Sequence, residues 1–103
     1  MSLSIEERHL KIINKILNEN LKNTNAVIYV FGSRANGKAG KYSDLDLAVD
    51  YSGQKLPFEI YASLVNAFEN SVLPYKVDVV DLNEISDQFR NNIKNDFVEL
   101  KII

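Results

Sequence analysis

The sequence contains no cysteine and no tryptophan, and it has one histidine and one methionine among 103 residues. Without cysteine, the chain has no disulfide bonds and no thiolate metal sites, which fits a reducing cytoplasm. No apolar run approaches the roughly 20 residues that a membrane-spanning helix needs. The acidic N-terminal residues lack the apolar core of a signal peptide. We therefore expect a cytoplasmic protein without membrane contact.

The chain also has no strong excess of either charge. Its formal net charge is -2, and its 46% hydrophobic and 25% charged residues are ordinary for a globular domain. Such a chain has no overall attraction for nucleic acid, so we expect no direct nucleic-acid binding. The length indicates one domain, residues 1–103. Because so short a chain buries a modest share of its surface, we expect either modest stability or support from a partner, as a homodimer or a hetero-oligomer.

Hydrophobic periodicity predicts a first helix from about Ser4 to Leu21. Ser4 and Glu7 have the S-x-x-E spacing of a capping box, in which a hydroxyl and a carboxylate bind the free amides at a helix start. Apolar residues then recur every three or four positions and form one stripe. His9 lies among charged residues, where a solvated surface histidine is a better interpretation than a metal ligand or an acid–base group.

Two further helices are predicted later in the chain. Pro57 suits the first position of the second helix, which ends in the segment 70–74. Asn83 or Ser86 is expected to cap the third helix, whose apolar residues are spaced four apart.

Short runs rich in β-branched and aromatic residues predict strands, the last of which is either an edge strand or a segment that docks elsewhere. These runs are Ala26–Phe31, Leu45–Tyr51, Lys76–Asp81 and Phe97–Ile103. Because only a loop separates the first two, we expect them to be antiparallel neighbours. The prediction is an α/β (α+β) fold with a small mixed β-sheet flanked by helices.

The turn after the first strand carries Gly32 and Ser33. Glycine lets the backbone approach a ligand closely, and amides at the start of a short helix over residues 33–36 would point at an anion. The Ser33 hydroxyl adds a donor for a nucleotide phosphate. Arg34 either contacts phosphate or braces the loop against a carboxylate. A mobile loop is expected over residues 37–41.

Asp44 and Asp46 lie two residues apart at the start of the second strand, so both side chains project from one face. Two like charges at this spacing repel each other unless a cation lies between them. Mg²⁺ suits such a pair, because it takes one or two carboxylates and completes its shell with water and phosphate oxygens. Alone, the D-x-D pattern is weak evidence, since surface strands often carry alternating acids. A third carboxylate would complete a two-metal site for attack on a phosphoryl group.

The third strand offers two candidates for this carboxylate, Asp78 and Asp81. An acid inside an apolar run is costly unless it is paired, which favours Asp78. Asp81 lies at the end of the run and can reach solvent or cap the next turn. We therefore predict that Asp78 points into the same cleft as Asp44 and Asp46.

Gly32-Ser33, ten residues and then Asp44-Leu45-Asp46 resemble the G-S-x10-D-x-D signature of the polymerase β-like nucleotidyltransferases. The form Gly-Ser-Arg-Ala followed by Ser-Asp-Leu-Asp-Leu, and the small size, are similar to the minimal nucleotidyltransferases (MNT proteins) of bacteria and archaea. The resemblance implies the polymerase β-like nucleotidyltransferase fold, Mg²⁺ and ATP as the donor. Carried over by position, it makes catalytic residues and metal ligands of Asp44, Asp46 and Asp78. It implies nucleotide binding by Gly32, Ser33, Arg34 and Ser43.

Minimal nucleotidyltransferases commonly accompany a small all-helical HEPN-domain protein. The pair resembles a toxin–antitoxin system in which the MNT protein adenylylates a tyrosine of the HEPN ribonuclease. The resemblance implies an antitoxin that transfers AMP from ATP to a HEPN-family toxin. One alternative is a non-catalytic antitoxin that neutralises its partner by binding, with the apolar tail from Val98 to Ile103 as a contact surface. Another is a transferase for a small-molecule acceptor, which would need a dimer to build the acceptor pocket.

Overall fold

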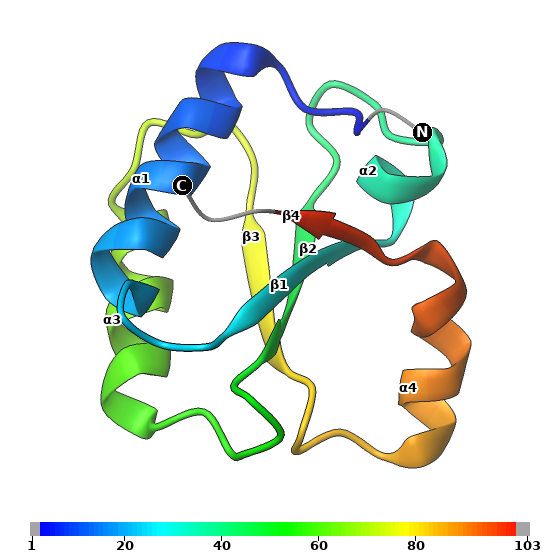
Figure 1. The fold of residues 1–103 in the computed structure, drawn as a ribbon. Helices are drawn as coiled ribbons and strands as arrows, with labels where there is room; N and C mark the ends of the chain where they lie inside the picture. The colour runs from blue at the N-terminus through cyan, green and yellow to red at the C-terminus, as the bar shows by residue number, and fades with distance from the viewer. Residues whose placement is uncertain (1–2, 101–103) are drawn as a thin grey trace.

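The chain forms a four-stranded sheet with helices on both faces (Figure 1). The computed structural model describes residues 3–100. In chain order the elements are α1 (Glu7–Leu21), β1 (Val27–Phe31), α2 (Ser33–Asn36), β2 (Leu45–Asp50), α3 (Phe58–Glu69), β3 (Val77–Asp81), α4 (Asp87–Ile93), the 3-10 helix η1 (Lys94–Asp96) and β4 (Val98–Leu100). None of the helices within residues 3–100 is both long enough and apolar enough to cross a membrane.

The order of strands in the sheet is β3-β2-β1-β4. β1 is antiparallel to both β2 and β4, which confirms the predicted pairing of the first two strands. β2 and β3 are parallel, because α3 carries the chain back to the starting end of the sheet. The mixed sheet flanked by helices confirms the predicted fold class.

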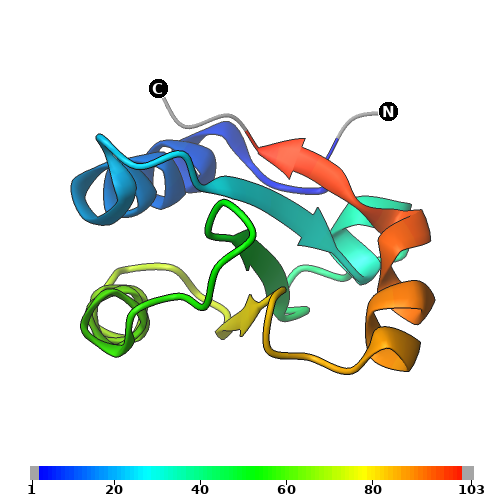
Figure 2. The same ribbon diagram turned by 60° about the horizontal axis from the view of Figure 1, so that its bottom comes forward.

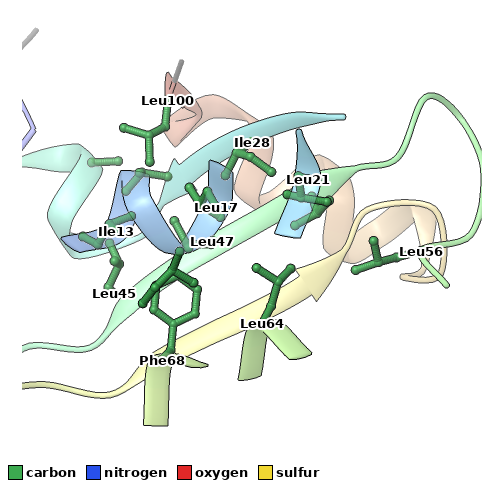
Figure 3. Packing of buried hydrophobic residues seen from close by; sticks show 14 residues of the cluster. Ile13, Leu17, Leu21, Ile28, Leu45, Leu47, Leu56, Leu64, Phe68 and Leu100 are labelled. Carbon is green, nitrogen blue, oxygen red and sulfur yellow. The ribbon is translucent and has the colours of Figure 1, made fainter. Parts of the chain in front are cut away.

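One face of the sheet packs against α1 and α3, which lie on the same side of it (Figures 1 and 2). Figure 3 shows that Leu45 and Leu47 of β2 lie among side chains of both helices, including Leu17 and Leu64. These four side chains are fully buried. Each such burial stabilises the fold by about 1.5–3 kcal/mol, so this face is the main core.

The opposite face carries a smaller apolar cluster built around Phe31, Ala48 and Leu82. Phe97 closes it from the segment before β4, with its ring stacked on Tyr29 at a centroid distance of 4.8 Å. α4 lies on this side of the sheet, away from α1 and α3 (Figure 2). Only part of the face is covered, so polar side chains find room on the rest.

The predicted capping box at the first helix is wrong. α1 begins at Glu7, with Glu6 as the preceding residue and no side-chain cap. The Ser4 amide donates to the Arg34 carbonyl at 2.9 Å, and the Ser4 carbonyl accepts from the Arg34 side chain at 2.7 Å. Contacts with α2 therefore hold Ser4 outside the helix.

The prediction of a solvated His9 is also wrong. His9 is 9% exposed, and its ring meets the edge of Tyr75 at a centroid distance of 5.4 Å. Tyr75 lies 66 positions away in sequence, so the charged neighbours of His9 gave no sign of this contact.

The other predicted helix signals have clear outcomes. Pro57 lies one position before the first residue of α3. Ser86 caps α4 by accepting from the Phe89 amide at 3.1 Å, which confirms one of the two proposed caps. The C-terminal segment forms the edge strand β4 over Val98–Leu100, and Leu100 is buried. The rest of the predicted strand, residues 101–103, lies outside the described residues.

Candidate active site

The turn after β1 depends on Gly32. Its φ of 73° and ψ of -154° place it in a region that only glycine adopts readily. A Cβ atom at this position would lie 2.5 Å from Oδ2 of Asp46. Both the conformation and the close approach therefore require glycine, and the turn brings the backbone directly against the second aspartate of the D-x-D pair.

The Gly32 turn leads into the predicted short helix, α2, which starts at Ser33 and ends at Asn36. Gly37 then adopts a left-handed conformation, with φ of 83°, and its amide donates to the Ser33 carbonyl. The first amides of any helix have no acceptor within it, so Ser33 and Arg34 present such groups next to Asp46. Gly32 and Ser33 thus form a turn beside Asp46, and their contact with a triphosphate stays a prediction.

The sheet register brings two of the predicted aspartates together. Asp46 of β2 lies opposite Asp78 of β3 in the parallel pair, so both side chains are on the same face. Asp44 directly precedes β2 and is exposed. Burial, then the charge of Asp78, then that of Asp44 raise the pKa of the Asp46 carboxyl above its ordinary value. The negative charges of Asp78 and Asp44 therefore act on the Asp46 carboxyl.

Asp78 and Asp81 have different surroundings, although both belong to β3. Asp78 is half-buried beside Asp46, and its Oδ1 lies 3.3 Å from the Lys76 ammonium. Asp81 accepts from the Leu56 amide at 2.8 Å and from the Asn83 amide at 3.0 Å. Asp81 thus holds the segment before α3 and the turn after β3, whereas Asp78 shares a face with the D-x-D pair.

A metal ion would have to complete this site with other ligands. Within residues 3–100, no three histidine, aspartate or glutamate side chains are grouped as a ready-made metal site. The chemistry of the donors nevertheless fits Mg²⁺, which needs only one or two carboxylates when phosphate oxygens and water supply the rest. The Lys76 ammonium beside Asp78 shows that this acidic face already attracts a cation.

Arg34 does not face the aspartates. Its side chain is 5% exposed, and its guanidinium donates to the carbonyls of Ser43, Lys41 and Ser4. The same group lies 3.9 Å from the centre of the Tyr75 ring. Of the two interpretations from the sequence, bracing of the loop matches the structure, with backbone carbonyls as partners in place of a carboxylate.

Ser43 also has a structural partner within the loop. Its hydroxyl accepts from the Gly40 amide at 2.8 Å, and its carbonyl accepts from Arg34. The Arg34 guanidinium is thus committed to the loop that leads to Asp44, which speaks against a phosphate contact. The Ser43 hydroxyl keeps its own proton as a donor, and its nucleotide contact stays a prediction. Nothing in the sequence marks Ser4 or Tyr75 as a partner of Arg34.

A cavity of about 590 Å³ lies on the other side of this loop. It is lined by residues that include Arg8, His9, Lys41 and Tyr75, and by none of the three aspartates. The acidic face next to Gly32 is therefore a separate feature of the surface.

A mixed sheet that brings a Gly-Ser turn, Asp46 and Asp78 together, with Asp44 just before the strand, is the arrangement expected of a nucleotidyltransferase. The comparison with protein families agrees: the family described as "Polymerase beta, Nucleotidyltransferase" matches residues 11–101. The chain belongs to this family, which confirms the resemblance found in the sequence.

Known relatives share both sequence and fold with the chain. A Haemophilus influenzae protein named "Probable protein adenylyltransferase MntA" is 38% identical over 99 residues, covering 96% of this chain and 84% of the relative. A solved toxin–antitoxin structure with AMP-PNP is 28% identical with a TM-score of 0.71, covering 91% of this chain and 73% of the other.

A more distant structure shows the common fold. It is a tri-AMPylated Shewanella oneidensis HEPN toxin in complex with MNT antitoxin, and the matched chain has a TM-score of 0.61 at 23% identity. The match covers 96% of this chain and 74% of the other.

Proposed function

We propose that this nucleotidyltransferase is Mg²⁺-dependent, transfers AMP from ATP to a tyrosine hydroxyl of a HEPN-family toxin and acts as its antitoxin. The observation that carries the proposal is the row formed by Gly32, Asp46 and Asp78, in which a glycine that leaves no room for a Cβ lies beside one carboxylate and the next strand supplies another. The relative named as a protein adenylyltransferase and the HEPN–MNT complex support the choice of acceptor.

The reaction exchanges one bond to phosphorus for another. The tyrosine oxygen attacks the α-phosphorus of ATP, and the bond from that phosphorus to the bridging oxygen breaks. Pyrophosphate leaves with the bonding electrons, and the hydroxyl proton must go to a base. Positioning and neutralisation of charge account for most catalysis in such transfers.

Each part of the site has a role in this scheme. Asp44 and Asp46 would hold Mg²⁺, which supplies charge neutralisation on the phosphate oxygens when bound. Gly32 and Ser33 would bind the phosphates, since a turn that only glycine allows brings the backbone beside the Asp46 carboxylate. Asp78 orients the tyrosine hydroxyl and accepts its proton.

Labelled ATP tests the proposal. The chain is incubated with Mg²⁺, ATP labelled in the α-phosphate and a HEPN-domain protein from the same organism as the proposed partner. We expect label on the HEPN protein, and none when EDTA is added or when the chain carries Asp44→Asn and Asp46→Asn. Absence of label, with folding and nucleotide binding verified, would contradict the proposal.

The same double variant separates catalysis from inhibition by binding alone. The tail that motivated a non-catalytic antitoxin is partly internal, since Leu100 is buried and Val98 pairs with Val30. We therefore expect the double variant to bind the toxin without neutralising it. Full neutralisation by the double variant would favour binding as the essential activity.

A further inference from the structure

β3 has an open outer edge in the part of the sheet that the structure describes. It is the end strand in the order β3-β2-β1-β4, so β2 is its one strand neighbour among residues 3–100. The Leu45 amide donates to the Lys76 carbonyl at 2.9 Å, and the Leu82 amide to the Val49 carbonyl at 2.9 Å. In a parallel ladder, successive residues turn their main-chain groups to alternate sides. Val77, Val79 and Asp81 therefore turn theirs outward.

A groove follows this edge on the side of α3. It consists of two hollows, about 380 Å³ beside Val77 and Val79 and about 290 Å³ beside Asp81. Tyr61 of α3 lines both hollows, and Phe58 lines the second. Phe58 is 73% exposed and Tyr61 is 37% exposed. The groove thus combines apolar side chains with main-chain donors and acceptors that have no partner strand.

The charges along the groove favour a basic occupant. Four acids and two lysines line its two hollows, which gives this edge a formal charge of -2. These residues are Glu69, Asp78, Asp81, Glu84, Lys55 and Lys76. Lys76 already pairs with Asp78, and Lys55 with Glu84 at 3.6 Å. A segment that carries basic residues would therefore complement the groove.

We propose that the outer edge of β3 is the acceptor-binding site, where an extended segment of the acceptor protein, outside its helices, adds as a further strand. This inference rests on the proposed function, because it describes how the acceptor protein presents its tyrosine hydroxyl for AMP transfer. Addition of a strand would satisfy the outward groups of Val77 and Val79, and alternate side chains would enter the groove beside Tyr61. Basic residues near the hydroxyl would face the acids of the groove.

The register places such a hydroxyl next to the predicted base. Neighbouring strands lie about 4.8 Å apart, and side chains opposite each other share a face. A tyrosine paired with Asp78 therefore continues the row from Asp46 to Asp78, on the face that carries the D-x-D pair. Its side chain can extend back across Asp78 toward a nucleotide held beside Gly32.

The first experiment removes one outward amide. Proline has no amide hydrogen and is tolerated on edge strands where that position faces outward, so Val79→Pro blocks strand addition while keeping the ladder to β2. We expect transfer of label from ATP to the HEPN-domain protein to fall about tenfold or more, since at least one hydrogen bond is lost and the ring obstructs its neighbour. Circular dichroism verifies the fold. Transfer at the wild-type rate would overturn the proposal.

The opposite edge of the sheet supplies a matched control. Glu99 lies opposite Tyr29 on β4, and the alternation along β1 turns the Glu99 amide away from the sheet. Glu99→Pro thus removes an outward amide at an edge far from the aspartates in the strand order. We expect wild-type transfer from this variant. Equal losses in both variants would attribute the effect to general damage and overturn the assignment.

Amide exchange followed by NMR tests docking without any substitution and without turnover. In the free chain we expect fast exchange at Val79 and slow exchange at Asp78 and Val80, which donate to β2. Addition of the HEPN-domain protein should slow amide exchange at Val79.

The possible outcomes separate the docking site from the proposed chemistry. Unchanged exchange at Val79 would overturn the docking site even if AMP transfer is observed. Slowing without AMP transfer would support the site while the proposed chemistry fails. If the Val79 amide is already protected in the free chain, and the free chain has the mass of a dimer, a second copy occupies the edge and the proposal is overturned.

Discussion

The two faces of β2 serve different purposes, although they alternate along only six residues. Leu45, Leu47 and Val49 are fully buried and pack against α1 and α3. On the opposite face, Asp46 lies against Gly32 and Asp78, and its pKa is raised mainly by burial and then by the neighbouring acids. One face stabilises the fold, and the other bears an electrostatic cost.

This contrast explains why the acids are on a strand. A strand clamped by a packed core holds its opposite side chains in a fixed geometry, as a transfer reaction requires. Local conflicts such as the Asp46–Asp78 repulsion and the conformation of Gly32 are the features expected at functional sites. Substitutions on the two faces should therefore change stability in opposite directions.

The largest expected effect is on the apolar face. Leu47→Ala leaves a cavity between the two helices and should lower the free energy of unfolding by about 2–5 kcal/mol. Leu47→Met conserves most of the volume and should cost less than about 1.5 kcal/mol. Urea unfolding measures both. A loss below about 1 kcal/mol for the alanine variant would show that Leu47 is not part of a closely packed core.

Substitution in the turn after β1 should have an intermediate effect on stability. Gly32→Ala places a Cβ 2.5 Å from Asp46 Oδ2 and forces alanine to a φ of 73°, so we expect a loss of about 1–3 kcal/mol and weaker Mg²⁺–ATP binding. Gly53 is the matched control, because its φ is 76° but a Cβ there meets no described atom within 4 Å. Gly53→Ala should cost less and leave nucleotide binding intact. Equal effects on nucleotide binding would remove the contact with Asp46 from the explanation.

The smallest expected effect is a gain in stability, from substitution of Asp46. The Asp46 pKa is raised in the folded state, so its ionisation destabilises the fold as pH rises above 3.8 and through the folded pKa. Asp46→Asn should therefore stabilise the free protein at pH 7, by less than about 1 kcal/mol because the group is partly exposed and screened by solvent.

This gain should fade as the pH falls below 3.8, where the wild-type carboxyl becomes protonated in both the folded and the unfolded state. Urea unfolding at several pH values measures it. A destabilised Asp46→Asn variant at pH 7 would contradict the cost assigned to the acidic face.

Local features, and features set by the alternation of side chains along a strand, could be predicted from the sequence. The D-x-D pair, the Gly-Ser turn and the strand faces follow from spacing, and the face of Asp78 follows from its position in an apolar run. The partners of Arg34 and His9 do not. Arg34 and His9 both contact Tyr75, which lies in the loop between α3 and β3. This loop comes close to them because the chain returns through α3 to the parallel strand β3. Such contacts depend on the tertiary structure, and neither residue has a local pattern that indicates them.

The most direct measurement compares two aspartates on one strand. Asp78→Asn and Asp81→Asn are assayed for transfer of labelled AMP and for urea unfolding. We expect Asp78→Asn to reduce transfer about 100-fold or more with little loss of stability, since it removes the predicted base. Asp81→Asn should lose much less transfer than Asp78→Asn but more stability, because its carboxylate accepts from two amides. Loss of transfer in Asp81→Asn with full activity in Asp78→Asn would contradict the assignment of the acidic face.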